Sequence, residues 1–366
     1  MNKNNQVNDD RALLDQMMAD LERADELYRP TNYWKTYEDV FLPELKKYGL
    51  HDFRRRKFSI LESFGASDLS IKGKVVPRIR FKGAEKISRM LNRFLWGNFL
   101  FPMSGLVCTS PEWITGYFYK HVLKKFQSAG MELNKCSASL FGNPEDIIEV
   151  NGLYWSLAHL NYCSMMVDTA RYINFGENMV VCELGSGMGR NIEILAKLYP
   201  EATLIMFDIS PQLYVANQYL VSVFGNRVIP YRDAVKLDKT SLDQIKGRIV
   251  ILPTWAMPKW SALKVDIFWN SASFQEMEPN VVKNYLGIVK KMSPGYIYID
   301  AMPKGNYWGE WKPGRGGVKE RILEKYYTDS LDKSYLLKHV YETDYFLRVK
   351  DYRSYVFKKT GAAGNG

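Results

Sequence analysis

The sequence predicts an α/β fold with a mostly parallel sheet, preceded by a mainly helical region. After residue 178 short apolar runs alternate with helical patterns, a glycine-rich turn follows the first of these runs, and two strand-like runs come near the end. This alternation is typical of parallel strands joined by right-handed helical crossovers. The chain of 366 residues is long enough for two domains. We place the boundary near residue 150, with the helical region over 1–150 and the α/β domain over 151–360.

In the N-terminal region, apolar residues recur at helical spacing in several stretches. We expect helices at 9–28, 84–97, 111–129 and 152–173. The first is amphipathic and ends before Pro30, so it covers a core or packs on a partner subunit, and a homo-oligomer is compatible with the sequence. We interpret 31–82 as irregular because Pro43 and three glycines interrupt it. Within it, 74–82 predicts an edge strand, since Pro77 excludes a central position.

In the C-terminal region, the pattern predicts an ordered series of strands and helices. We expect strands at 179–183, 202–208, 227–231, 265–270 and 296–301, with helices at 192–198, 212–223 and 279–292. The strand-like runs at 338–349 and 352–358 predict an antiparallel hairpin. Such a hairpin is often found at the edge of an otherwise parallel sheet.

A glycine-rich turn follows the first expected strand, in the run 183–190 (ELGSGMGR). Gly185, Gly187 and Gly189 let the backbone turn tightly and let a ligand approach the main chain. A dinucleotide fingerprint would read G-x-G-x-x-G and place a pyrophosphate on the helix N-terminus. The tighter spacing here, with Glu183 before the first glycine, favours a ligand that lacks phosphate and has a charged amino-acid end.

Acids near the ends of the next two strands complete a nucleoside site. Asp208 ends the second strand, where a carboxylate can accept both ribose hydroxyls. Asp233 follows the third strand and can accept a hydrogen bond from an adenine amino group. These features predict a Rossmann-like domain that binds S-adenosylmethionine, although Asp208 alone is also compatible with a helix N-cap. The expected cofactor-binding residues are Glu183, Gly185, Ser186, Gly187, Gly189, Asp208, Ile209, Asp233 and Asn270.

The loop after the fourth expected strand narrows the interpretation. The runs NSASFQEMEPNVVKNYL, ELGSGMGRN and FDIS resemble the sugar O-methyltransferases of bacterial polysaccharide, O-antigen and glycosylated-antibiotic pathways, in the class I methyltransferase superfamily. The resemblance is strongest over 150–300, and the YWKTYE and FRRRKFSILESFG runs look like that family's leader. It implies S-adenosylmethionine as cofactor and a sugar hydroxyl as acceptor, on a glycan, a nucleotide sugar or a glycosylated natural product. It assigns no catalytic residue.

A sugar hydroxyl is a poor nucleophile at neutral pH, so a general base or a metal ion usually assists. We expect Glu276 to be the base, because the loop after the fourth strand passes the methyl group in this fold. His159, on a helix that enters the α/β domain, and Asp300, at the end of the fifth strand, are alternatives. Each residue also has a simpler possible role. Glu276 would bind acceptor hydroxyls without moving a proton, His159 would be a structural histidine, and Asp300 would cap a loop. No contiguous metal motif is visible in the sequence, so the sequence is compatible with a divalent ion but does not indicate one.

Two loops supply the expected acceptor-binding residues. These residues are Ser273, Gln275, Trp308, Trp311 and Arg315. The last three belong to the glycine-rich segment 304–318, where the tryptophans could stack on sugar faces and the arginine could meet a phosphate. The alternative is a surface loop whose tryptophans pack on the domain. Glycine hinges would also let this segment close over the site as a lid.

The net charge of +10 is concentrated in one part of the chain. Residues 51–100 contain twelve Lys and Arg against four Asp and Glu, starting with the basic run 54–57 (RRRK). This stretch is either a solvated surface or a field that attracts a phosphate-bearing acceptor, a nucleic acid or an anionic membrane face.

The remaining features concern location and competing functions. The N-terminus lacks the apolar segment of a signal peptide, no run reaches the roughly 18 apolar residues of a membrane span, and the four cysteines are widely spaced. These observations favour a cytoplasmic protein without a transmembrane segment.

The basic stretch prompts an RNA methyltransferase as an alternative, but we recognise no RNA-binding module and expect no nucleic-acid partner. A non-catalytic S-adenosylmethionine-binding protein is the other alternative.

Overall fold

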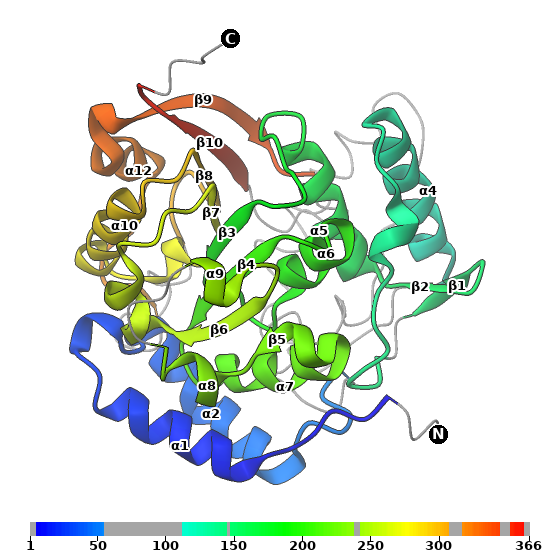
Figure 1. Ribbon diagram of the computed structural model, residues 1–366, viewed down its shortest axis with the longest axis horizontal. Coiled ribbons are helices and arrows are strands. Elements are labelled where there is room, and N and C mark those ends of the chain that lie inside the picture. Colours follow the sequence, from blue (N-terminus) through cyan, green and yellow to red (C-terminus); the bar gives the residue numbers. More distant parts are fainter. Residues whose placement is uncertain are drawn as a thin grey trace, which may run out of the picture.

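The computed structural model in Figure 1 describes residues 5–54, 112–144, 147–237, 242–306, 317–344 and 352–361. Within these residues an eight-stranded sheet has the order β5-β6-β4-β3-β7-β8-β10-β9. Its strands are β3 (Val180–Leu184), β4 (Thr203–Asp208), β5 (Val228–Ile229), β6 (Ile249–Pro253), β7 (Ile267–Ser271), β8 (Tyr296–Ala301), β9 (Tyr335–Glu342) and β10 (Arg353–Lys359). Neighbours from β5 to β8 are parallel, and β10 is antiparallel to β8 and β9. The predicted mixed α/β fold with a C-terminal hairpin is confirmed.

Helices cover both faces of this sheet. The helices α5 (Leu157–Thr169), α6 (Arg190–Leu198) and α7 (Gln212–Phe224) pack in one buried cluster, and α10 (Pro279–Met292) and α12 (Glu324–Leu331) pack in the other. In β3, Val181 belongs to the first cluster, whereas Val180 and Cys182 belong to the second. A strand that is buried on both sides needs apolar residues at successive positions, which explains its VVC sequence.

The N-terminal helices are tied to the sheet domain. They are α1 (Arg11–Glu22), α2 (Asn32–Tyr48) and α4 (Glu112–Ser128), and a small hairpin of β1 (Ile148–Val150) and β2 (Leu153–Trp155) follows them. The acids before and on α1 bind α7 and the short helix α8 (Tyr231–Ala234), through Tyr214–Asp9, Arg232–Asp10 and Tyr231–Asp20. Leu14 of α1 and Leu213 of α7 also share one core cluster. The domain boundary near residue 150 stays a prediction, and the β1–β2 hairpin spans that point.

The expectation that residues 31–82 are irregular is wrong for the part of this range that the structure describes, because helix α2 lies there. It includes Pro43, which removes a backbone donor and costs about 3 kcal/mol in a helix interior. Tyr33, Phe41 and Leu45 are nevertheless buried, at spacings that are multiples of four. Each buried side chain contributes about 1.5–3 kcal/mol, which outweighs the proline. The expected first helix is shorter than predicted, because α1 ends at Glu22 and a 3₁₀ turn follows at Glu26–Tyr28.

The sheet contains β6, a strand that the sequence interpretation missed. Its IVIL run, between Gly247 and Pro253, is too short to show a period that separates a strand from a buried helix. It lies between β4 and β5. The expected strand at 227–231 is reduced to Val228–Ile229, because α8 begins at Tyr231. The expected helix at 152–173 begins only at Leu157, where the Ser156 side chain caps it.

Arg54 corrects the picture of a uniformly solvated basic stretch. It is buried, and its guanidinium donates hydrogen bonds to the carbonyls of Ser139, at 2.6 Å, and Phe141, at 3.2 Å. Arg54 therefore joins two segments of the N-terminal region instead of presenting a charge to solvent. The rest of the basic stretch, with the expected elements at 74–82 and 84–97, lies outside the described residues. None of the described helices is long and apolar enough to cross a membrane.

Candidate active site

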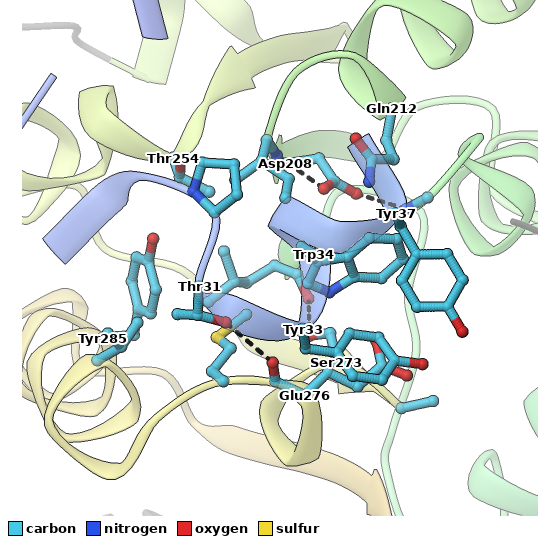
Figure 2. A pocket seen from close by; sticks show the side chains of 18 of the residues that line it. Thr31, Tyr33, Trp34, Tyr37, Asp208, Gln212, Thr254, Ser273, Glu276 and Tyr285 are labelled. Atoms are coloured by element: carbon cyan, nitrogen blue, oxygen red, sulfur yellow. Dashed lines mark hydrogen bonds between the residues drawn. The ribbon is translucent and has the colours of Figure 1, made fainter. Parts of the chain in front are cut away.

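A cavity of about 200 Å³ lies at the carboxyl ends of β3, β4, β6 and β7 (Figure 2). Its walls come from the loops after these strands, from α10 and from residues 29–37 of the N-terminal region. The order of the parallel strands reverses between β3, whose next strand β4 lies on one side, and β7, which lies on the other. Ligands of open α/β sheets bind at such a switch point, so this cavity is the candidate active site.

The turn after β3 has the backbone conformation that its glycines predict. Gly185, Gly187 and Gly189 have φ angles of 76°, 56° and 87°, in the left-handed region that favours glycine. A Cβ on Gly185 would lie 2.2 Å from Ser273 Oγ, and one on Gly189 would lie 2.8 Å from Leu220 Cδ1. The turn therefore packs directly against the loop after β7 and against α7, and its bare backbone forms part of the cavity wall.

Glu183 is buried at the end of β3, beneath the glycine turn. Its Oε1 accepts a hydrogen bond of 2.7 Å from Asn191 Nδ2. Its Oε2 has no partner of good hydrogen-bonding geometry among the described residues, although the Ser186 hydroxyl interacts with the carboxyl group. Burial raises the pKa of Glu183 to about 8. A positively charged ligand group would favour its ionised form, because an unpaired charge is costly in a buried place.

Arg190 is a cavity residue that the sequence interpretation missed, although it is the last residue of ELGSGMGR. It begins α6 directly after the turn and is buried, with its guanidinium carbon 5.8 Å from the ring centre of Tyr162. Arg190, Tyr162 and Glu183 line a second cavity of about 60 Å³, which shares Gly185 and other residues with the first. A guanidinium and a carboxyl group in one small cavity suit a zwitterionic ligand end.

Asp208 ends β4 and lines the main cavity. Its Oδ2 accepts a hydrogen bond of 2.6 Å from Gly187 N, and its Oδ1 accepts one of 2.7 Å from Ile209 N. Burial raises its pKa to about 7, and these two hydrogen bonds oppose the shift. The alternative of a helix N-cap does not hold, because Pro211 occupies the N-cap position of α7 and no side chain caps it.

We expect Asp208→Ala to weaken binding of S-adenosylhomocysteine by about 10- to 150-fold without unfolding the chain. The reason is the loss of hydrogen bonds to a carboxylate, worth about 1.5–3 kcal/mol. Calorimetric titration gives the affinity, and circular dichroism reports the fold. Asp233→Ala is the matched control, because Asp233 is exposed outside both cavities and should leave the affinity unchanged. Equal affinities for both variants would show that Asp208 does not hold the ribose.

Asp233 itself does not reach the site that the sequence interpretation assigned to it. Its side chain is 65% exposed on α8 and lies 3.7 Å from Lys236 Nζ. The physical reason is the insertion of β6 between β4 and β5, which moves the chain after β5 one strand away from Asp208. Thr254, which follows β6, lines the cavity instead, together with Ile209.

The loop after β7 brings Glu276 to the cavity. Glu276 ends the 3₁₀ turn Phe274–Glu276 and lines the cavity with Ser273. Asn270 and Gln275 do not line it, contrary to expectation. Asn270 is fully buried and donates to Leu184 O and to Ser273 Oγ, so it holds the loop against β3. The Gln275 side chain donates a hydrogen bond to the Tyr352 hydroxyl and accepts one from the Met302 backbone N–H.

The two alternatives to Glu276 as base lie outside both cavities. His159 is buried with its Nε2 2.6 Å from the Cys136 carbonyl, and burial lowers its pKa to about 4. Asp300 is buried on β8 and accepts a hydrogen bond from the Thr343 hydroxyl. This placement, outside the cavity that Glu276 lines, does not support a base role for either residue. Burial and tertiary partners, which no local pattern reveals, decide this outcome.

Several expected residues cannot be placed. Trp308, Trp311 and Arg315 lie outside the described residues. The described residues contain no group of three or more His, Cys, Asp or Glu that could hold a metal ion. By contrast, α2 adds residues to the cavity that the sequence interpretation did not assign. They are Tyr33, Trp34 and Tyr37, from the YWKTYE run.

Comparison with known protein families gives no match, and comparison with curated proteins gives none either. Among solved structures, the chain is similar to the pyocyanin biosynthetic protein PhzM, with 14% identity and a TM-score of 0.38 over 56% of each chain. It is similar to the magnesium protoporphyrin IX methyltransferase ChlM from Synechocystis PCC 6803, with 13% identity and a TM-score of 0.40, over 68% of this chain and 98% of that one. It is also similar to the methyltransferase domain of a bacterial Hen1, with 12% identity and a TM-score of 0.37, over 56% of this chain and 100% of that one.

Proposed function

We propose that this protein is an S-adenosylmethionine-dependent methyltransferase that methylates a hydroxyl group of a sugar acceptor. One observation carries the proposal. Two adjoining cavities bring together the buried carboxyl groups of Glu183 and Asp208, at the ends of adjacent strands, and Glu276, on the loop after β7. The first two suit a cofactor with an amino-acid end and a ribose, and the third can act on an acceptor.

The residues around the cavities fit S-adenosylmethionine. Buried polar atoms without hydrogen-bond partners among the described residues include Glu183 Oε2, Asn191 Oδ1 and Gln212 Oε1. Each unsatisfied buried group costs about 1–3 kcal/mol, so these atoms favour a ligand that bonds to them. Glu183 would hold the ammonium group, Arg190 the carboxylate and Asp208 the ribose hydroxyls. The bare backbone of the glycine turn leaves room beside them.

When bound, S-adenosylmethionine supplies a methyl group on a positively charged sulfur, already activated for in-line displacement. The residues of the chain have to hold the acceptor oxygen in line and remove its proton as the carbon–oxygen bond forms and the carbon–sulfur bond breaks. Glu276 is on the cavity wall, and the Thr31 hydroxyl donates a hydrogen bond of 3.2 Å to its backbone carbonyl. We infer that this turn presents the Glu276 carboxylate as the proton acceptor.

The sugar acceptor is supported by the resemblance of the run 270–286 and by the character of the cavity wall. Arg29 is the one basic residue among the described residues that line the main cavity, whereas aromatic side chains and hydroxyl groups are frequent there. A wall of this kind suits a neutral, hydroxyl-rich ring better than a nucleic-acid backbone, which would need several cations.

Binding of S-adenosylhomocysteine should strengthen as pH rises from about 6 to 8 and then level off. Burial raises the pKa of Glu183 to about 8 and that of Asp208 to about 7. Both carboxyl groups are therefore largely protonated in the free protein at pH 6. A ligand with an ammonium group favours the ionised form of Glu183, so binding must release protons in this pH window.

Calorimetry in two buffers of different ionisation enthalpy measures both the affinity and the released protons. Glu183→Gln keeps the hydrogen bond to Asn191 but removes the carboxyl group with the higher pKa. It should bind more weakly and keep only the part of the pH dependence that Asp208 causes. Affinity that does not change with pH in the wild type, with no proton release, would contradict the ammonium site at Glu183.

Methyl transfer is tested by mass spectrometry of the full chain with S-adenosylmethionine and a panel of nucleotide sugars and glycans. The proposal predicts the gain of one methyl group on a sugar. Tight binding of S-adenosylhomocysteine without transfer to any member of the panel would contradict a sugar methyltransferase and favour a non-catalytic binding protein. Methylation of RNA in a parallel reaction would show that the acceptor is a nucleic acid and not a free sugar or glycan.

A further inference from the structure

Three aromatic side chains at the start of α2 form a cluster in the main cavity (Figure 2). The ring centres of Tyr33 and Trp34 are 5.5 Å apart, those of Tyr33 and Tyr37 are 5.0 Å apart, and those of Trp34 and Tyr37 are 5.5 Å apart. In Figure 2, Trp34 is seen between Asp208 on one side and Ser273 on the other. We call Tyr33, Trp34 and Tyr37 the α2 aromatic cluster.

Residues along one side of α2 contact two different parts of the protein, the main core and the cavity. Tyr33, Tyr37, Phe41 and Leu45 recur every four positions and therefore lie along one side of α2. Phe41 and Leu45 are buried in the main core, with 1% and 0% of their surface exposed. Tyr33 and Tyr37 line the cavity instead. Tyr33 is itself only 8% exposed, so it packs on the fold and borders the cavity at the same time.

Hydrogen bonds hold this end of α2 against the site. They are Thr254 Oγ1 to Tyr28 O at 2.9 Å, Thr31 Oγ1 to Glu276 O at 3.2 Å and Asn32 Nδ2 to Gly317 O at 2.5 Å. The first anchors the chain beside the end of β6, and the second anchors it to the turn that carries Glu276. The α2 aromatic cluster is therefore positioned relative to both the cofactor side and Glu276.

The chemistry of the cluster differs from that of the strand ends. Glu183, Arg190 and Asp208 supply the charged groups that a cofactor needs, whereas the cluster offers ring faces and phenolic hydroxyls. Burial raises the pKa of Tyr33, and the nearby Glu276 carboxyl raises it further, so its hydroxyl stays protonated and can donate. A pyranose ring has an apolar C–H face that packs on an aromatic ring and an edge of hydroxyls that bond to Tyr and Glu side chains.

We propose that the α2 aromatic cluster is the acceptor subsite and binds a pyranose ring by stacking, with one ring hydroxyl directed to Glu276. This inference rests on the proposed methyltransferase function and adds the site and the ring class of the acceptor. The site combines a helix of the N-terminal region with the loop after β7, so the acceptor binds between segments far apart in the sequence.

Saturation-transfer NMR tests this subsite on the full chain saturated with S-adenosylhomocysteine. The probes are the methyl pyranosides of glucose, mannose, galactose and rhamnose. We expect transfer to ring C–H protons of at least one probe. Trp34→Leu should weaken that probe's binding about tenfold, because it removes the aromatic face, whereas Trp34→Phe should retain most of it. All variants should bind S-adenosylhomocysteine within about twofold of the wild type.

Tyr48→Leu is the matched control, because Tyr48 ends the same helix and is 44% exposed outside the cavity. If Trp34→Leu does not fold, by circular dichroism, Tyr37→Leu takes its place. Wild type that binds S-adenosylhomocysteine but none of the pyranosides overturns the subsite alone. A Trp34 variant that loses cofactor affinity in parallel also overturns it, because the ring then belongs to the cofactor pocket. Wild type that does not bind S-adenosylhomocysteine overturns the proposed function, and the subsite with it.

Discussion

Glu276→Gln is expected to lower kcat by about 10²–10⁴-fold while cofactor affinity stays unchanged. A general base contributes a factor of this size, and glutamine keeps the shape and most of the hydrogen bonds but cannot accept the proton. Glu276 lines the main cavity on the turn after β7. The loss should shrink as pH rises, because the acceptor hydroxyl then ionises more readily without help. Steady-state methyl-transfer kinetics across a pH series, with calorimetry for the cofactor, measure both effects.

Glu278→Gln is the matched control for this variant. Glu278 lies two residues further along, outside the cavity, and its carboxylate accepts hydrogen bonds from Lys319 N and Glu320 N. Glutamine keeps one of the two accepting oxygens, and Glu278 lies outside the cavity, so kcat should be close to that of the wild type. A Glu276→Gln enzyme whose KM rises with a nearly normal kcat would contradict the base role and leave Glu276 as a hydroxyl-binding residue. Repeating the assay with a chelator would show whether a divalent ion assists.

Gly187→Val should abolish detectable binding of S-adenosylhomocysteine. Gly187 has φ 56°, a conformation that costs a side chain about 1–3 kcal/mol, and a branched residue more than most. It also lines both cavities and donates its backbone N–H to Asp208. A valine there would displace the backbone that positions Asp208 and would fill the space beside the cofactor. Calorimetry at high protein concentration measures the loss, and thermal unfolding reports whether the variant folds.

The control for this glycine is Gly176→Val. No heavy atom lies within 4 Å of a Cβ built on Gly176, and its φ is not in the left-handed region. This variant should keep wild-type affinity. Gly187→Ala adds the strain with less bulk, so it separates the two causes if the valine variant does not fold. Normal binding by a folded Gly187→Val protein would refute the proposed cofactor pocket.

The glycine turn and Asp208 show what local sequence can predict. Gly185, Gly187 and Gly189 have positive φ as expected from their residue type, because only glycine adopts this conformation at little cost. Asp208 reaches the cavity because consecutive parallel strands of an α/β unit place their carboxyl ends at one edge of the sheet. Their binding roles stay predictions, which the variants above test.

Asp233 and Asn270 show where the same reasoning fails. Both follow or end expected strands, as Asp208 does, but Asp233 is exposed on α8 and Asn270 is buried under the loop. Strand order is a property of the whole sheet. The short IVIL run of β6, which enters between β4 and β5, replaces Asp233 by Thr254 at the cavity.

By itself, the sequence determined the alternation of strands and helices, the glycine turn and the position of Asp208, because periodicity, turn chemistry and chain order act over short distances. The tertiary structure decided which candidates share one cavity. It buried His159 and Asp300 among structural partners and brought α2, more than 200 residues earlier in the chain, to Glu276. Burial and long-range contacts come from the packing of the complete fold, and no local pattern of residues encodes them.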